Sequence, residues 1–255
     1  MRFASIGSGS EGNALIVEVA QTRVMLDCGF AVSETCRRLE RIGLQAEQLS
    51  AIVVTHEHGD HISGVAKLAR KFGTPVYLTH GTRRAQQLAF NDLTSIVEID
   101  AHQSFAIGDI LVHPFTVPHD AREPVQYVFC DGAKRLGVLT DTGRSTPHIE
   151  NMLNACDALV LECNHDVNML ERGPYPHHLK QRVSGNYGHL SNAAAAALLA
   201  SLDNSKLQHI IAAHLSQRNN TVDLAVQALS SVLGCTNNWI GLATQEEGFV
   251  WREIS

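Results

Sequence analysis

The segment THEHGDH, residues 55–61, holds an unusual density of side chains that bind metals. Three histidines and one aspartate stand within six residues, namely His56, His58, Asp60 and His61. Imidazole and carboxylate groups suit zinc, manganese or iron, and a tight turn at Gly59 would let these side chains converge. The helical zinc motif HExxH is absent, because Asp60 occupies the position of its second histidine. The segment therefore predicts a metal site rather than a solvated polar loop.

Strands predicted from apolar runs position this segment and several other candidate residues. Residues 51–55, AIVVT, form a short buried strand that leads directly into His56. Four further candidates also follow strands: Asp27 after 23–26, His119 after 110–117, Asp141 after 136–140 and His214 after 210–213. The side chains that could carry chemistry thus stand at the ends of strands.

Strands and helices alternate along the chain. Further strands are predicted at residues 3–6, 14–19, 76–78, 95–99, 125–130 and 158–162, and helices at 33–42, 63–72, 82–89, 149–155, 192–202 and 222–233. Residues 164–188 are polar and contain Pro174 and Pro176, which indicates one long loop before Ser191, the N-cap of an alanine-rich helix. Because no linker or repeat interrupts this pattern, it predicts one mixed α/β domain over residues 1–255.

Composition limits the classes of protein to which the chain can belong. The longest apolar runs are far shorter than the roughly 20 residues that span a bilayer, so no membrane association is expected. The N-terminus, MRFASIGSGSEGN, lacks the pattern of an export signal, and we expect a cytoplasmic protein. The six cysteines form no CxxC pair and are predicted to be reduced and mostly buried.

The formal net charge of -6 argues against a protein that coats nucleic acid through bulk electrostatics. It does not exclude a nuclease, because two divalent ions would add about four positive charges at the place where a phosphate binds. Nothing in the sequence indicates an obligate protein partner.

The HxHxDH pattern of residues 56–61 resembles that of the metallo-β-lactamase superfamily, and the resemblance continues in order along the chain. Asp27 resembles the first motif of that superfamily, and His119, Asp141 and His214 resemble the third, fourth and fifth. The resemblance implies a four-layer αββα sandwich, in which two mixed β-sheets are flanked by helices. It also implies that the metals lie at the edge between the two sheets.

A ligand set for two divalent metal ions, zinc or manganese, follows from the same resemblance. One metal would be held by His56, His58 and His119, and the other by Asp60, His61 and His214. Asp141 would bridge the two ions, and Asp27 would orient the histidine segment from behind the ligands. His189 competes with His214 for its place in this set.

Four dispersed segments resemble the YycJ (WalJ) family of bacterial metallohydrolases: GSGSEGNA (7–14), ECNHD (162–166), YPHHLKQRVSGNYGHLSN (175–192) and HLSQRNN (214–220). That family's implied activity is exonucleolytic, on DNA from the 5′ end. His189 also resembles the histidine of the histidine-serine element in tRNA-3′-processing nucleases, which assists the leaving oxygen.

Basic residues of the long loop favour a phosphodiester substrate. Arg172, His177, His178, Lys180 and Arg182 fall within a dozen residues, and Tyr175 is available for base stacking. We predict phosphate contacts for Lys180 and Arg182, against the alternative of a solvated surface. Ser8 and Ser10 would hold a phosphate or form a turn, and His165 would bind a phosphate or lie near the second metal.

The predicted function is a two-metal-dependent phosphodiesterase that acts on nucleic acid as a 5′-to-3′ DNA exonuclease. A metal-bridging hydroxide would attack phosphorus, Asp60 would help to orient and deprotonate it, and His189 would protonate the leaving oxygen. The alternatives are a hydrolase of a small thioester, lactone or cyclic phosphate, an RNA-processing nuclease, and a scaffold that keeps metal for stability.

Overall fold

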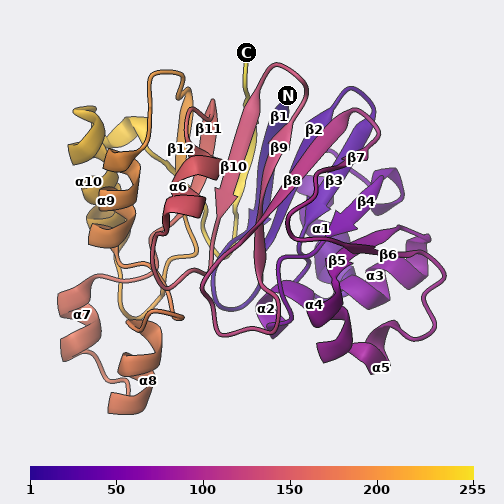
Figure 1. The fold of residues 1–255 in the computed structure, drawn as a ribbon, viewed down its shortest axis with the longest axis horizontal. Helices are drawn as coiled ribbons and strands as arrows, with labels where there is room; N and C mark the ends of the chain where they lie inside the picture. Colours follow the sequence, from indigo (N-terminus) through magenta and orange to yellow (C-terminus); the bar gives the residue numbers. More distant parts are fainter.

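Two seven-stranded β-sheets face each other in the computed structural model, which describes residues 1–255 (Figure 1). In spatial order the first sheet contains β14 (Phe249–Glu253), β1 (Arg2–Gly7), β2 (Ala14–Val19), β3 (Thr22–Leu26), β4 (Ala51–Val53), β5 (Val76–Thr79) and β6 (Ile96–Ile99). The second sheet contains β13 (Gly241–Leu242), β12 (His209–Ala213), β11 (Ala158–Glu162), β10 (Arg135–Leu139), β9 (Val125–Cys130), β8 (Ile110–Thr116) and β7 (Phe105–Ile107).

Helices cover the outer face of each sheet (Figure 1). On the side of the first sheet lie α1 (Val32–Arg41), α2 (Gly59–Ile62), α3 (Val65–Phe72), α4 (His80–Ala85) and α5 (Gln87–Phe90). On the side of the second lie α6 (Pro147–Leu153), α9 (Asn192–Ser201) and α10 (Val222–Leu233), while α7 (Val167–Arg172) and α8 (His177–Val183) project below it. Two single 3₁₀ turns, Ala46–Gln48 and Asn237–Trp239, complete the elements. The αββα layering expected for the metallo-β-lactamase fold is confirmed.

Three apolar layers hold the sandwich together. Side chains such as Phe3, Val53 and Phe129 fill the space between the sheets, and two further clusters lie between each sheet and its helices. Because both faces of the central strands are covered, strands such as β11 are buried along their whole length and read as continuous apolar runs. The hydroxyl of Tyr127 donates to the carbonyl of Val54 at 2.7 Å and ties the two sheets together.

The strand directions bring many polar strand ends to one edge of the sandwich. Strands β3 to β6 run parallel in the first sheet, and β10 to β13 run parallel in the second. Their carboxyl ends meet at the lower end of the molecule in Figure 1, beside α2. In α/β sheets, ligand sites form at such carboxyl ends.

The polar stretch 164–188, predicted as one long loop, contains the helices α7 and α8, so that prediction was wrong. Helix α8 has no buried residue, and a helix without an apolar face leaves no periodic signal in the sequence. Helix α7 is instead marked by its N-cap, Asp166, whose carboxylate accepts from the amide of Met169 at 2.9 Å. The strands β7, β13 and β14 were also missed, because they are short or lie at sheet edges.

None of the helices is long and apolar enough to cross a membrane. All six cysteines are free, and Cys28, Cys156 and Cys163 are buried. Burial raises the pKa of the Cys28 and Cys156 thiols to about 11, which keeps them protonated and unreactive at neutral pH.

Candidate metal centre

Several strand ends turn sharply and project a polar side chain over the edge of the sandwich. Asp27 follows β3, Asp141 follows β10 after one residue, and His214 follows β12. All three have left-handed backbones, with φ of 59°, 53° and 54°. Such a conformation costs a non-glycine residue of order 1–3 kcal/mol and persists where surrounding contacts enforce it, which is frequent at functional sites.

His56, His58 and His119 form the first of the two ligand groups that the resemblance implied, with ligand atoms within 4.8 Å of one another. Nδ1 of His119 donates to the carbonyl of Gly188 at 3.0 Å, so its Nε2 faces Nδ1 of His58 at 3.2 Å. The Thr55 hydroxyl donates to Asp27 and therefore accepts from Nδ1 of His56 at 3.0 Å. The rings of His119 and His56 are thus each held through one nitrogen and present the other to the centre of the group.

Asp60, His61 and His214 form the second group, again with ligand atoms within 4.8 Å. Nε2 of His61 and Nε2 of His214 both lie 3.4 Å from Oδ2 of Asp60. Asp27 fixes the His61 ring, because its Oδ2 accepts from Nδ1 of His61 at 2.8 Å. Asp27 also accepts from the backbone amide of Thr55 at 2.8 Å, so it orients the histidine segment from behind, as the resemblance implied.

Asp141 lies between the two groups. Its Oδ2 is 3.1 Å from Nε2 of His61, and its Oδ1 is 3.6 Å from Nε2 of His214 and 4.0 Å from Nε2 of His119. Oδ2 of Asp141 and Nε2 of His56 are both buried, and neither has a hydrogen-bond partner. Since buried polar atoms are nearly always satisfied, these two atoms indicate a missing partner, and bound cations would supply it. The donor set therefore fits a site for two metal ions.

The electrostatics of the cluster also fit bound cations. Burial alone would raise the pKa of the Asp141 carboxyl, yet the imidazoles of His214 and His61 hold it well below its usual range. Burial alone would lower the pKa of His61, yet the carboxylates of Asp141 and Asp60 raise it well above its usual value. Buried negative charge is thus balanced by protonated imidazoles, a role that divalent cations take over when they bind and displace those protons.

Glu162 is a functional residue that sequence analysis did not identify. Its fully buried carboxylate accepts from the amides of Thr142 and Leu190 at 3.1 and 3.0 Å. Its Oε1 accepts from Nδ1 of His189 at 2.7 Å and lies 3.4 Å from Nδ1 of His214. Glu162 therefore orients both histidines. A carboxylate at the end of the wholly apolar strand β11 was the signal that could have revealed it.

Asn13 is a second residue that sequence analysis missed. Its Nδ2 lies 3.4 Å from Oδ2 of Asp60 and 3.2 Å from Nε2 of His61, while its Oδ1 accepts from the amide of Gly9 at 2.8 Å. Asn13 thus joins the glycine-rich turn after β1 to the metal cluster. Nothing in the sequence around it indicates these partners, which lie almost fifty residues away.

A cavity of about 360 Å³ opens over the metal cluster. Asp60 and His189 line it, as do Ser10, Tyr175 and Arg182 from other parts of the chain. Nε of Arg182 donates to Oδ2 of Asp120 at 2.6 Å, and Oδ1 of Asp120 lies 3.8 Å from Nε2 of His58. The helices α7 and α8 thus bring a guanidinium and an aromatic ring to the mouth of the metal centre.

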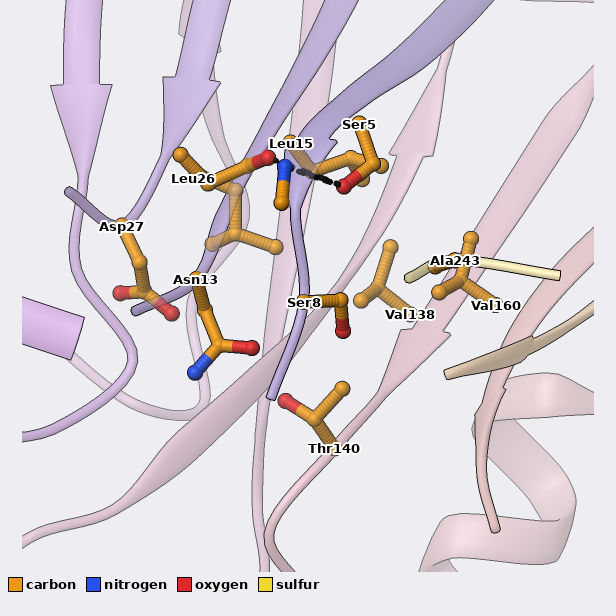
Figure 2. A pocket seen from close by; sticks show the side chains of 12 residues that line it. Ser5, Ser8, Asn13, Leu15, Leu26, Asp27, Val138, Thr140, Val160 and Ala243 are labelled. Atoms are coloured by element: carbon orange, nitrogen blue, oxygen red, sulfur yellow. Dashed lines mark hydrogen bonds between the residues drawn. The ribbon is translucent and has the colours of Figure 1, made fainter. Parts of the chain in front are cut away.

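Three residues predicted to contact substrate do not line this cavity. Ser8 is buried behind His214 and accepts from its amide at 3.0 Å; Figure 2 shows it beside a small cavity of about 30 Å³ between the sheets, near Asp27. Lys180 turns toward α7, where its ammonium donates to the carbonyl of Glu171 at 2.7 Å. His165 is buried, and its Nδ1 has no hydrogen-bond partner.

Comparison with known proteins agrees with the fold and the ligand groups. A family model described as the beta-lactamase superfamily domain matches residues 22–214. Exodeoxyribonuclease YycJ of Bacillus anthracis is 36% identical over 237 residues, which cover 91% of this chain and 89% of that protein. Exodeoxyribonuclease WalJ of Streptococcus pneumoniae serotype 2 is 33% identical over 94% of this chain and 91% of its own length. The chain belongs to the metallo-β-lactamase superfamily.

Solved structures of the superfamily share the fold at low sequence identity. The metallo-β-lactamase fold protein YhfI of Bacillus subtilis superposes with a TM-score of 0.76 at 16% identity, and 99% of both chains is covered. PqqB of Methylobacterium extorquens, a Zn²⁺-bound structure, gives a TM-score of 0.71 at 15% identity, with 99% of this chain and all of that chain covered. These likenesses concern the metallo-β-lactamase fold alone.

We expect this member of the superfamily, once purified, to bind about two metal ions. The variant Asp141→Ala should lose both, because the Asp141 carboxylate faces both ligand groups. Elemental analysis after metal-replete purification measures the stoichiometry. Asp157→Ala is a matched control, since Asp157 is a buried carboxylate that binds the amide of Arg135, remote from the cluster. Retention of both ions by the Asp141 variant would contradict the bridging position.

Proposed function

We propose that this chain is a two-metal-dependent phosphodiesterase that acts on nucleic acid as a 5′-to-3′ DNA exonuclease. The observation that carries the proposal is the single cavity in which Asp60 and His189 face Arg182 and Tyr175. It combines groups for proton transfer with groups for binding a phosphate and a base. The names of YycJ and WalJ as exodeoxyribonucleases support the choice of DNA.

The metal ions would be held by the two ligand groups with Asp141 between them: His56, His58 and His119, and Asp60, His61 and His214. Bound there, a pair of divalent ions supplies Lewis acidity, which activates water at neutral pH and offsets the charge that develops on a phosphodiester. Imidazole and carboxylate donors suit both zinc and manganese. The Zn²⁺-bound structure of the fold relative PqqB supports zinc as one of these.

Asp60 would orient the attacking water and accept its proton. Its side chain is 21% exposed and lines the cavity, whereas Asp141 is 2% exposed. Asn13 lies 3.4 Å from Oδ2 of Asp60 and limits its rotation. A carboxylate fixed at the surface of the site in this way is suited to orienting a water molecule. Burial alone would raise its pKa, but His61 and His214 hold that pKa well below the usual range and make it a weak base before metal binds.

His189 would donate a proton to the leaving oxygen from Nε2. Its Nδ1 is engaged by Glu162 at 2.7 Å, so Nε2 is the nitrogen free to face the cavity. Burial lowers the pKa of His189, but the carboxylates of Glu162 and Asp141 outweigh it and raise that pKa above the usual value. A raised pKa favours the protonated ring, which is the form that a general acid requires.

Arg182 and Tyr175 would bind the substrate nucleotide next to the reacting phosphate. The Arg182 guanidinium is 57% exposed and already approaches the cavity, where it is paired with Asp120. A guanidinium can bind phosphate through two parallel hydrogen bonds, and a tyrosine ring can stack on a base of any sequence. Both groups come from the α7–α8 region, outside the two sheets.

A panel of substrates tests the proposal directly. We expect metal-supplemented protein to degrade end-labelled linear DNA from the 5′ end and to leave circular single-stranded DNA intact, because removal of nucleotides needs a free end. Labelled RNA, a thioester and a lactone are assayed beside it. Turnover of a thioester or lactone with no cleavage of any nucleic acid would overturn the proposal in favour of a small-molecule hydrolase.

The roles of His189 and His214 are separable by the leaving group. We expect His214→Ala to lose metal from the second ligand group, and His189→Ala to keep both ions yet lose roughly 10²–10⁴-fold in turnover of DNA. On bis-p-nitrophenyl phosphate, whose leaving group needs no proton, the His189 defect should shrink while the His214 defect persists. Missing metal in the His189 variant, with equal losses on both substrates, would make His189 the ligand instead.

Arg182 and Lys180 form a matched pair for testing phosphate contact, because they lie two residues apart on α8 and only Arg182 lines the cavity. We expect Arg182→Ala to weaken binding of single-stranded DNA and to flatten the slope of log affinity against log salt by about 0.7. Lys180→Ala should leave that slope unchanged. Fluorescence anisotropy across a salt series measures the slope for each variant. Equal slopes in the wild type and the Arg182 variant would mean that Arg182 only pairs with Asp120 and does not contact phosphate.

A further inference from the structure

A second cavity adjoins the metal centre on the other side of α2. It has a volume of about 470 Å³ and runs between α2 and α3 on one side and the α4–α5 region on the other. Figure 1 shows α7 and α8 on one side of α2 and α4 and α5 on the opposite side. We call this second cavity the α3–α5 groove.

Gly59 connects the α3–α5 groove with the cavity over the metal cluster, because it lines both. It is the first residue of α2, and its φ lies outside the left-handed region, so the backbone does not require glycine there. A Cβ at this position would meet only the Ser63 hydroxyl, at 3.4 Å. Because Gly59 has no side chain, nothing at this position projects between the two cavities.

The chemistry of the α3–α5 groove complements a polyanion. Two basic residues, Lys67 and Arg70, and one acidic residue, Asp92, line it, and Arg70 is paired with Asp92. Lys67 lines the groove and has no ion-pair partner, and the amide side chains of Gln86 and Asn91 line it as well. Leu88 stands at its wall with 91% of its surface exposed, which provides an apolar surface for a base.

We infer that the α3–α5 groove binds the body of a single-stranded nucleic acid whose end lies in the cavity over the metal cluster. The inference rests on the proposed function and adds the path of the strand to it. The strand would cross α2 at Gly59, with Lys67 on its phosphates and Leu88 against its bases. Tyr175, Leu179 and Arg182 also line the metal cavity, and in this path they would contact the terminal nucleotide of a strand that enters from the α3–α5 groove. A path that brings the terminal nucleotide to the metal cluster suits a substrate that is degraded from its terminus.

Charge reversal at Lys67 tests this path. For Lys67→Glu we expect kcat/KM on single-stranded DNA to fall about 10-fold, which corresponds to one lost charged contact. The defect should grow as the substrate lengthens from a dinucleotide to about 12 nucleotides, because only longer strands reach the groove. Lys206→Glu is the matched control, since Lys206 is exposed in the connection between α9 and β12, outside both cavities.

A photoreactive amino acid in place of Leu88 provides a readout that does not depend on catalysis. We expect it to cross-link to single-stranded DNA, whereas the same amino acid in place of Val250, which is 69% exposed on β14, should not. Single-stranded RNA, assayed beside single-stranded DNA, shows which of the two nucleic acids the groove prefers.

The outcomes separate the two proposals. Suppose that the wild type cleaves nucleic acid, that Lys67→Glu shows the same dependence on substrate length as the wild type, and that position 88 gives no cross-link. These results would overturn the inferred binding in the α3–α5 groove and leave the proposed function standing. Cross-linking at position 88 without cleavage of any nucleic acid would support the groove and overturn the exonuclease. A protein that neither binds nor cleaves nucleic acid would overturn both.

Discussion

The burial of the Asp141 carboxylate among imidazoles is the constraint on which the rest of the structure depends. A charged group that is 2% exposed, with one oxygen lacking a hydrogen-bond partner, is costly unless positive charge surrounds it. Histidines from both ligand groups approach it, and each group combines residues that follow strands of both sheets. The two sheets must therefore be held at a fixed separation and register. The apolar layer between them and the hydrogen bond from Tyr127 to Val54 provide this rigidity.

The same constraint accounts for the strained backbone at the sheet edge. Asp27, Asp141 and His214 each adopt a positive φ directly beyond a strand, which turns their side chains inward over the edge. Hydrogen bonds hold them there: Asp27 binds Thr55 and His61, and the amide of His214 donates to Ser8. A structure that over-determines a few strained residues in this way keeps ligands in place before a cation arrives.

The candidate metal centre and the surfaces proposed to bind the substrate belong to different parts of the molecule. The ligand groups stand at one edge of the sandwich, at strand ends and on α2. The walls around them come from short helices outside the sheets, α7 and α8 on one side and α4 and α5 on the other. Because one fold hosts many activities, these appended helices carry the argument for a nucleic acid substrate.

The sequence by itself determined the superfamily, the αββα layering and the residues that converge at the metal centre, because these depend on local signals. HxHxDH is contiguous, and each further candidate stands at or just beyond the end of an apolar run that is typical of a strand. Only the tertiary structure decided which further polar residues contact and orient those ligands. Glu162 and Asn13 act on partners tens of residues away, and no local pattern records such contacts.

The tertiary structure also sorted residues that look alike in the sequence. Lys180 and Arg182 are both basic and two positions apart, yet a helix turns side chains at that spacing to different sides, so one binds α7 and the other reaches the cavity. Ser8 and Ser10, in the turn after β1, also separate: Ser8 is buried behind His214 and Ser10 lies at the cavity wall. The helix α8 itself could not be predicted because it buries no side chain. Composition records which groups are present, whereas the direction in which each points is set by packing between distant segments.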